Sequence, residues 1–483
     1  MAQPPTKPFT PRPGDAPDTG EGLILPADRE LSGKLAGLSL PRQVAVLAIW
    51  PLLEQTLNFL VTFIDTMITG HLPIERQSVP AMDAITVGGY VIWVVGMLQM
   101  SMGIGAAALV ARAIGARHKR LANAALGQAL VLGVCCGSMI AVGLWLIAPY
   151  LARLMNLDDQ AAPFCVAYLR IIAPVAPMIG WLLIGNAALR AAGDTWRPFV
   201  VMVCVNLTNI ATSLLFVYGP APVGGHGVAG IAAGTALSWC VGSAIVLTML
   251  ARGRSPIRLR LTRLRPHWHT MQRIIRVGVP NLVESSGMWA TNFAVLWYIG
   301  QMHTRAAMGA HMIAVRLEGI SYMLGFAIAT AAATLVGQYM GLGDVQRARR
   351  AVLLCFGIAL ALMSAMGVLF LVVPEQLVHL VSRADEHRDI APTLLRICAF
   401  IQPMFAAMAV FGAALRGAGD TRATMFLSGS SMVMLRLIVA YIVTVHLSMG
   451  LAALWVVLCA DLALRGLLFG GRFLHGGWAK VRV

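Results

Sequence analysis

The sequence has little charge. Only 12% of its 483 residues are charged, whereas about a quarter are charged in an ordinary soluble domain, and 58% are hydrophobic with a mean hydropathy of +0.75. A soluble globular protein is therefore excluded. Apolar runs such as 123–147, 226–250 and 350–373 are long enough for helices that cross a bilayer, which need about 20 residues. The short alternating segments typical of a membrane β-barrel are missing.

The sequence also lacks the motifs of an enzyme or a metalloprotein. It has no Walker loop, no HExxH and no aspartate-rich metal cluster, and the pair Asp158–Asp159 falls in a loop between predicted spans. Seven of its eight cysteines lie in predicted spans and the eighth, Cys165, directly precedes one. They form no CxxC or Cys/His cluster, so we interpret them as small core residues. We therefore expect no enzymatic activity, no metal and no cofactor.

Charged, glycine-rich and proline-rich breaks divide the chain into predicted transmembrane helices. The twelve ranges are 43–69, 84–110, 123–147, 166–187, 198–218, 226–250, 275–299, 309–336, 350–373, 391–413, 424–446 and 449–471. The predicted fold class is an all-α polytopic membrane protein.

Basic residues are distributed unevenly between the two sides of this topology. Of the 37 Lys and Arg residues, 28 fall on the side that holds both termini and seven on the other. Because cytoplasmic segments carry an excess of Lys and Arg, both termini are predicted to be cytoplasmic, with the chain in the cytoplasmic (inner) membrane. The run 252–276 alone contains eight Arg. We interpret it as a linker that touches anionic lipid headgroups, in preference to a nucleic-acid site.

The residues before the first predicted span have a different composition. The first 24 are rich in Pro, Gly and acidic residues, which is typical of a disordered tail, and they lack the apolar core of a signal peptide. Residues 30–40 predict a short interfacial helix.

The sequence repeats itself at an offset of 226 positions. LRAAGDTWRP at 189–198 returns as LRGAGDTRAT at 415–424, within a longer ungapped match of 169–195 to 395–421. Six helices per half is an even number, so the repeat is parallel and predicts two six-helix lobes with a central cleft. We expect a monomer with five parts: a cytoplasmic tail (1–42), an N-lobe of helices one to six (43–250), a basic cytoplasmic linker (251–275), a C-lobe of helices seven to twelve (276–472) and a cytoplasmic tail (473–483).

The repeated decapeptide has the composition of a turn between two helices. Arg190 is favourable near the C-terminal dipole of the helix that it ends. Gly193 permits a turn, Asp194 and Thr195 are expected to cap the next helix, and Pro198 favours its first turn. This interpretation gives the motif a structural role and no catalytic one.

These motifs resemble the multidrug and toxic compound extrusion family. The resemblance rests on the repeat, the two LRxAGDT turns, LVGQYMGLGD at 335–344 and WVVLCADLALRGLLFGGRFLHGGW at 455–478, and it covers roughly residues 40–478. It implies twelve helices in two lobes, and efflux of organic cations or other amphipaths in exchange for protons or sodium.

Polar side chains line one face of the first predicted helix. Glu54, Asn58, Thr62 and Asp65 follow one another at i, i+4, i+8 and i+11, and such a stripe has to face a wet cavity or another helix. We interpret Asp65 as an ion-coupling carboxylate, since ionisable groups in a span are costly. The alternatives are an interfacial acid or a partner for an Arg. Glu54 is equally compatible with lining the cavity and with bonding another helix.

The resemblance extends this ion site to helices five and six. It matches Asp65 to the family's first-helix Asp, and Asn209 and Thr235 to the polar groups that complete the N-lobe site. Ser213 stands where one branch of the family has a second carboxylate, which favours protons over sodium as the coupling ion. Sodium remains the alternative.

The second half lacks these groups. At the repeat offset Asn209 corresponds to Leu435, Asp65 falls near Val295, and the tenth predicted helix has no acid at 402–413, where the resemblance leads us to look for one. Ion chemistry is therefore expected in the N-lobe.

The C-lobe has charges of its own. Glu284 follows Pro280 much as Glu54 follows Pro51, on one helix face with Asn292, and cavity lining and inter-helix bonding are equally compatible with it. Arg316 and Glu318 are two residues apart and do not face each other on a helix, so another acid is expected beside Arg316. Glu318 has two open roles, a buried structural pair or cation binding. The set Arg436, Asp461 and Arg465 is interpreted as structural pairing.

These observations predict a secondary active transporter that exports amphipathic cationic small molecules in antiport with protons. The expected cleft residues are Glu54, Asn58, Thr62, Glu284, Asn292 and Glu318. The partners are these substrates and the lipid bilayer, with no nucleic acid. The alternatives are sodium-coupled efflux, or an exporter or flippase of one metabolite or lipid-linked substrate; a flippase favours an Arg-lined cavity, whereas the deep charges here are mostly acids.

Overall fold

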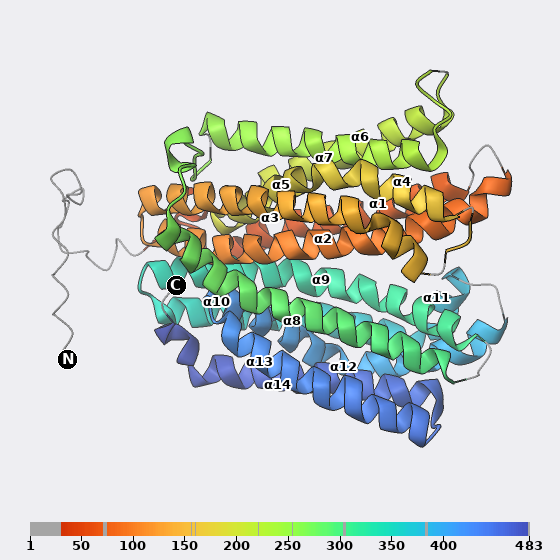
Figure 1. The fold of residues 1–483 in the computed structure, drawn as a ribbon. Coiled ribbons are helices and arrows are strands. Elements are labelled where there is room, and N and C mark those ends of the chain that lie inside the picture. Colours follow the sequence, from red (N-terminus) through yellow and green to blue (C-terminus); the bar gives the residue numbers. More distant parts are fainter. Residues whose placement is uncertain are drawn as a thin grey trace, which may run out of the picture.

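A computed structural model gives the fold. It describes residues 30–70, 75–155, 157–159, 161–220, 222–253, 255–302, 306–381 and 385–481, and the side chains of residues 58–70, 75–83, 86, 261 and 385 lie outside the description. Within the described ranges the regular structure is helical, and the helices form two halves of six spans each (Figure 1). The predicted fold class is confirmed.

The N-terminal half contains seven helices that make six spans. They are α1 (Leu40–Gly70), α2 (Glu75–Gly115), α3 (Lys119–Leu154), α4 (Ala161–Ile172), α5 (Ala176–Ala191), α6 (Trp196–Tyr218) and α7 (Gly227–Arg252). The fourth span is divided into α4 and α5 by a 3-10 turn, Ala173–Val175. Two prolines explain this break, since Pro174 and Pro177 each remove a backbone donor from the helical ladder.

The C-terminal half repeats this order. Its helices are α8 (Trp268–Gly300), α9 (Ala307–Gly341), α10 (Val345–Val372), α11 (Pro374–Val381), α12 (Asp385–Gly417), α13 (Thr421–Ser431) and α14 (Gly450–His475). The eleventh span continues beyond α13 as π-helical turns, Met432–Val439 and Ile442–His446, which the sequence did not predict. The short α11 was not predicted either.

Ten of the described helical segments are long and apolar enough to cross a membrane. The two spans outside this set are α1 and α8, the first helix of each half. The α8 helix carries the polar stripe with Glu284, and α1 is described with its side chains only as far as residue 57. Both helices lie among the others, parallel to the bundle (Figure 1).

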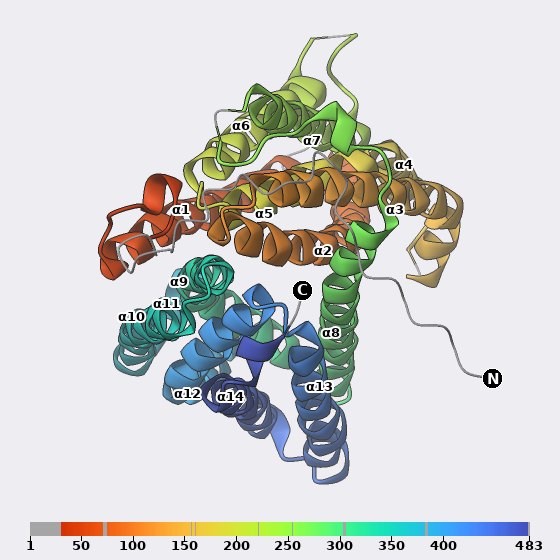
Figure 2. The same cartoon turned by 90° about the vertical axis from the view of Figure 1, so that its left-hand side faces the viewer.

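The two halves lie side by side, and both ends of the described chain are on one side of the bundle (Figures 1 and 2). The carbonyl oxygen of Glu30 accepts a hydrogen bond from Arg117, two residues after α2, and that of Val481 accepts one from Arg112 in the last turn of α2. We call this the terminal side.

The segment before α1 packs against the opposite half. Leu31 and Leu35 are almost fully buried in a core formed mainly by α9, α10 and α12. The interfacial helix predicted over 30–40 is reduced to one 3-10 turn, Gly33–Leu35, because Gly33 and Gly37 adopt positive φ angles that a continuing helix does not allow.

Candidate functional site

The two repeated turns have the predicted shape and different side-chain contacts. Gly193 and Gly419 adopt φ angles of +84° and +86°, as the repeat predicts for positions where the chain reverses. The predicted capping is wrong. Thr195 makes no cap bond and donates to the carbonyl oxygen of Val46 at 2.9 Å. The buried Asp194 carboxylate lies 2.9 Å from the Lys34 ammonium.

The arginine of each repeated turn pairs with a glutamate on the first helix of its own half. Arg190 Nη1 lies 3.1 Å from both carboxylate oxygens of Glu54. Arg416 Nη1 lies 2.9 Å from Glu284 Oε1. Sequence analysis missed these pairs and assigned Arg190 to the helix dipole. A sequence pattern that occurs once in each half could have predicted them. Each half has a glutamate shortly after a proline in its first helix and an arginine in its LRxAGDT motif.

Glu284 is held by more than its arginine. Its Oε1 also accepts a hydrogen bond from Ser428 and its Oε2 accepts one from Thr424, each at 2.9 Å, and its side chain is only 10% exposed. These donors come from α12 and α13. A carboxylate with three donors, one of which is a guanidinium, has little capacity left for a substrate cation.

The structure describes only the first member of the polar stripe on α1. Glu54 is partly buried. Asn58, Thr62 and Asp65 belong to the α1 helix, but their side chains lie outside the described residues. Their assignment to the ion site and the cleft stays a prediction.

The polar residues predicted on helices five and six come together on α6 and α7. Asn209 Nδ2 donates to Thr235 Oγ1 at 3.1 Å. Asn209 and Ser213 are one helical turn apart on α6, and both are buried. Among the described residues, Asn209 Oδ1 and Ser213 Oγ have no hydrogen-bond partner. Since α6 packs against α1, two unsatisfied oxygens lie on a helix adjoining the polar stripe.

A network of charges fills the interior of the C-terminal half. Asp461 is fully buried, and its Oδ2 lies 2.6 Å from Arg436 Nε and 2.5 Å from Arg465 Nη2. Ser431 donates to its Oδ1 at 2.6 Å, and Arg436 Nη1 donates to Asn292 Oδ1 at 2.6 Å. The predicted structural pairing is present, and it joins α8, α14 and the π-helical turn.

The side chains of Glu318 and Arg316 lie on different faces of α9. Glu318 is partly buried with Cys398 and Arg436 as neighbours, so it lies toward the same C-terminal interior. Arg316 is exposed, and the part of the chain that the structure describes contains no ion pair of Arg316. The acidic partner expected for Arg316 is therefore not found there.

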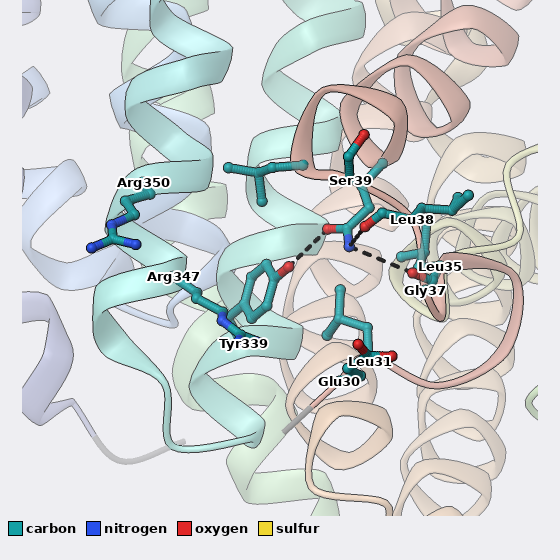
Figure 3. Close-up of a pocket in the computed structure, with 11 residues that line it drawn as sticks. Glu30, Leu31, Leu35, Gly37, Leu38, Ser39, Tyr339, Arg347 and Arg350 are labelled. Carbon is teal, nitrogen blue, oxygen red and sulfur yellow. Dashed lines mark hydrogen bonds between the residues drawn. The ribbon is translucent and has the colours of Figure 1, made fainter. Parts of the chain in front are cut away.

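Two hollows on the terminal side adjoin the junction of the halves. The larger, about 470 Å³, lies between the segment 30–43 and α9–α10, and Tyr339, Arg347 and Arg350 are among its lining residues (Figure 3). The smaller, about 270 Å³, is lined by residues of α2 and α9 that include Arg112 and Gly341. In the described ranges, no three His, Cys, Asp or Glu residues are grouped as metal ligands.

Comparison with known proteins agrees with the repeat. The sequence profile of the MatE family matches residues 52–215 and again residues 280–442. The chain is 27% identical over 443 residues to the probable multidrug resistance protein NorM of Thermotoga maritima, an alignment that covers 92% of this chain and 94% of that protein. It is 26% identical over 325 residues to the FAD transporter of Shewanella oneidensis, covering 66% of this chain and 68% of that one.

A solved structure shares the fold. A crystal structure described as MATE in the bent conformation superimposes with a TM-score of 0.84 at 20% identity, covering 91% of this chain and 96% of that chain. The profile matches account for a large part of both halves, one match in each. The chain belongs to the MatE family, and it is a membrane transporter and not an enzyme.

Proposed function

We propose that this transporter exports amphipathic small molecules across the cytoplasmic membrane in antiport with protons, with its terminal side in the cytoplasm. The orientation is supported by the excess of Lys and Arg on that side. The observation that carries the coupling proposal is the difference between the halves. Asn209 and Ser213 have buried, unsatisfied oxygens on α6, a helix that packs against α1, whereas the equivalent position to Asn209 in the other half is Leu435.

The coupling site combines Asp65 with Asn209, Thr235 and Ser213. A carboxylic acid that is protonated becomes a hydrogen-bond donor, and unsatisfied oxygens on the adjoining helix are suitable acceptors. A sodium ion instead requires several oxygen ligands, with carboxylates to neutralise it. Ser213 supplies a hydroxyl where a second carboxylate would favour sodium, so the proposed ion is the proton.

We expect transport to follow the pH gradient and to ignore sodium. Purified protein in lipid vesicles should move an ethidium-like dye in response to a pH jump, and the rate should be unchanged when potassium replaces sodium. A protein-free vesicle under the same jump controls for passive dye movement. Transport that needs sodium and does not respond to pH would reverse the choice of ion.

The proposed charge of the substrate depends on which acids of the expected cleft and coupling residues are not neutralised by an arginine. Glu54 and Glu284 are each neutralised by an arginine. Glu318 makes no ion pair in the described part of the chain. Asp65, whose side chain lies outside the description, is the other acid among the expected cleft and coupling residues. Opposite charges attract more strongly in a low-dielectric interior than in water, so these two acids favour cations. We propose planar amphipathic cations as the main substrates.

Substitution of Glu318 should separate cationic from neutral compounds. Glu318→Gln is expected to weaken binding of an ethidium-like cation by about tenfold, or about 1.4 kcal/mol, which is the interaction of two unit charges about 12 Å apart at an effective dielectric constant near 20. Binding of a neutral compound of similar shape should change little. Glu284→Gln is the matched control, because Glu284 is already paired and should affect both compounds alike. Equal losses in Glu318→Gln would refute the cation preference.

A second candidate is export of one anionic metabolite. Two observations favour it: the similarity to an FAD transporter and the exposed Arg316 on α9. Binding of a flavin nucleotide that is lost in Arg316→Gln, together with weak binding of ethidium-like cations, would support this alternative.

A further inference from the structure

Helices α2 and α9 cross at their ends on the terminal side, where the two halves meet. A Cβ atom added at Gly115 of α2 would lie 1.9 Å from the carbonyl oxygen of Gln338. One added at Gly341 of α9 would lie 2.1 Å from the carbonyl oxygen of Arg112. Both distances are far below van der Waals contact. A glycine of each helix is therefore seated on the backbone of the other, and a side chain at either position would separate them.

The crossing follows the internal repeat. Gly115 and Gly341 are 226 positions apart, and so are Arg112 and Gln338. Helix α2 therefore contacts α9 in the same way that α9 contacts α2. A local pseudo-twofold relation of this kind makes the two glycines equivalent, and substitutions at either should have equal effects.

The same two helices also hold the repeated turns of the opposite half. Gln338 Nε2 donates to the carbonyl oxygen of Ala191 at 2.9 Å. Arg112 Nη2 donates to the carbonyl oxygen of Ala418 at 3.2 Å. Ala191 is the third residue of the first LRxAGDT motif and ends α5, and Ala418 is the fourth residue of the second motif. The duplicated motif thus supplies acceptors that join the halves, which is a reason for its presence in both.

Further contacts reinforce the junction beside the crossing. Thr334 Oγ1 of α9 donates to the carbonyl oxygen of Arg190 at 3.3 Å. Tyr339 donates its hydroxyl to Gln43 Oε1 of α1 at 2.8 Å, and Gln43 in turn bonds the carbonyl oxygen of Leu38 in the segment before α1 (Figure 3). These bonds belong to the rim of the junction, next to the larger hollow.

We propose that the α2–α9 crossing closes the cytoplasmic side of the transporter, and that Gly115, Gly341, Arg112 and Gln338 are positioning residues for the transport cycle. The proposal rests on the proposed function for its orientation and for alternating access. Separation of the crossing breaks the hydrogen bonds of Arg112 and Gln338 and the close contacts of three glycines, Gly115, Gly337 and Gly341, and the two hollows adjoin it. The halves can therefore part without unpacking most of their own cores.

The repeated arginines connect this closure to the first helix of each half. The guanidinium of Arg190 bonds Glu54 on α1, while its carbonyl oxygen accepts from α9. Arg416 bonds Glu284 on α8, two residues before the carbonyl oxygen that accepts from Arg112. A movement of α1 or α8 is thereby transmitted to the closure. This assigns Glu54 and Glu284 a positioning role.

The test adds a single methyl group at the crossing. Gly115→Ala and Gly341→Ala each introduce a Cβ atom that would overlap the backbone of the other helix. Gly96→Ala on α2 and Gly319→Ala on α9 are matched controls, because a Cβ atom at either position meets nothing within 4 Å. Ala is normally the better helix former, so lost helix propensity cannot explain a defect.

Both crossing variants should slow vesicle transport by about tenfold or more, since they disfavour one of the two alternating states. Hydrogen–deuterium exchange of the full-length protein should rise in residues 109–118 and 335–344 and remain unchanged elsewhere. The unfolding temperature should stay near that of the unmodified protein. The two control variants should match the unmodified protein in all three measurements.

The proposal would be overturned if Gly115→Ala and Gly341→Ala show the same transport and hydrogen exchange as the unmodified protein. It would also be overturned if only one of the two variants is defective. If the alanine variants do not fold, Gln338→Met tests the closure without added bulk. It removes the donor to Ala191 and should raise exchange in the same two segments, and unchanged exchange would refute the closure. Exchange is measured without substrate or gradient, so a wrong coupling ion or substrate leaves this result unaffected.

Discussion

Asp65→Asn is expected to abolish gradient-driven efflux while the protein still folds and inserts. The asparagine keeps the size and polarity of the side chain but cannot take up or release a proton. One elementary charge moved across roughly 150 mV yields about 3.5 kcal/mol. That is enough for a few-hundred-fold gradient of a neutral substrate, so a single carboxylate is sufficient for coupling. Efflux from vesicles under a pH gradient measures the loss.

Two further variants make this expectation specific. Asp65→Glu restores a carboxyl group on the same helix face and should recover part of the transport. Asn209→Leu copies the residue that the repeat places in the other half, Leu435. It removes one of the two unsatisfied oxygens of α6 and should lower transport at a given pH gradient without affecting folding. Normal efflux in Asp65→Asn would show that coupling takes place elsewhere.

The fold was predictable because its main determinants are local. Hydropathy identifies ten of the spans from their own residues, and the duplication at 189–198 and 415–424 shows that the two halves repeat one another. The positive φ angles of Gly193 and Gly419 also follow from local turn chemistry. The break between α4 and α5 has a local cause as well, in Pro174 and Pro177, although sequence analysis predicted this span as one undivided helix.

The partners of the charged residues were harder to predict because they are distant in sequence. Arg190 lies 136 positions from Glu54, and Arg416 lies 132 from Glu284. Such pairs depend on how the helices pack against one another, and hydropathy and capping preferences carry no information about that packing. The same limit applies in part to Asp194, whose sequence fits a cap. Its carboxylate pairs with Lys34 from the segment before α1 and with Arg197 in the first turn of α6.

Spacing did succeed where both partners share a helix. Asp461 and Arg465 are separated by one helical turn and form the predicted pair. Spacing alone could not show that Arg436 also reaches Asp461, because that contact depends on a π-helical turn in the eleventh span. π-Helical turns are rare and have no reliable signal in one sequence.

Asp461→Ala is expected to be the most destabilising single substitution in the described part of the C-terminal half. The carboxylate is fully buried, and it neutralises Arg436 and Arg465 while accepting a hydrogen bond from Ser431. Its removal leaves two guanidinium groups and a hydroxyl without their anion. Breaking a buried ion pair by removing one partner costs about 3–5 kcal/mol. Denaturant-induced unfolding in detergent should show a loss of this size.

A double variant distinguishes the buried charge from the lost volume. In Asp461→Ala with Arg465→Met, one of the two stranded guanidinium groups is replaced by an apolar side chain of similar length. Replacing a buried ion pair by well-packed apolar residues is often nearly neutral. The double variant should therefore be more stable than Asp461→Ala alone, although Arg436 remains without its anion. If the single variant is as stable as the unmodified protein, or if the double variant is less stable than the single one, the network does not stabilise the C-terminal half through charge neutralisation.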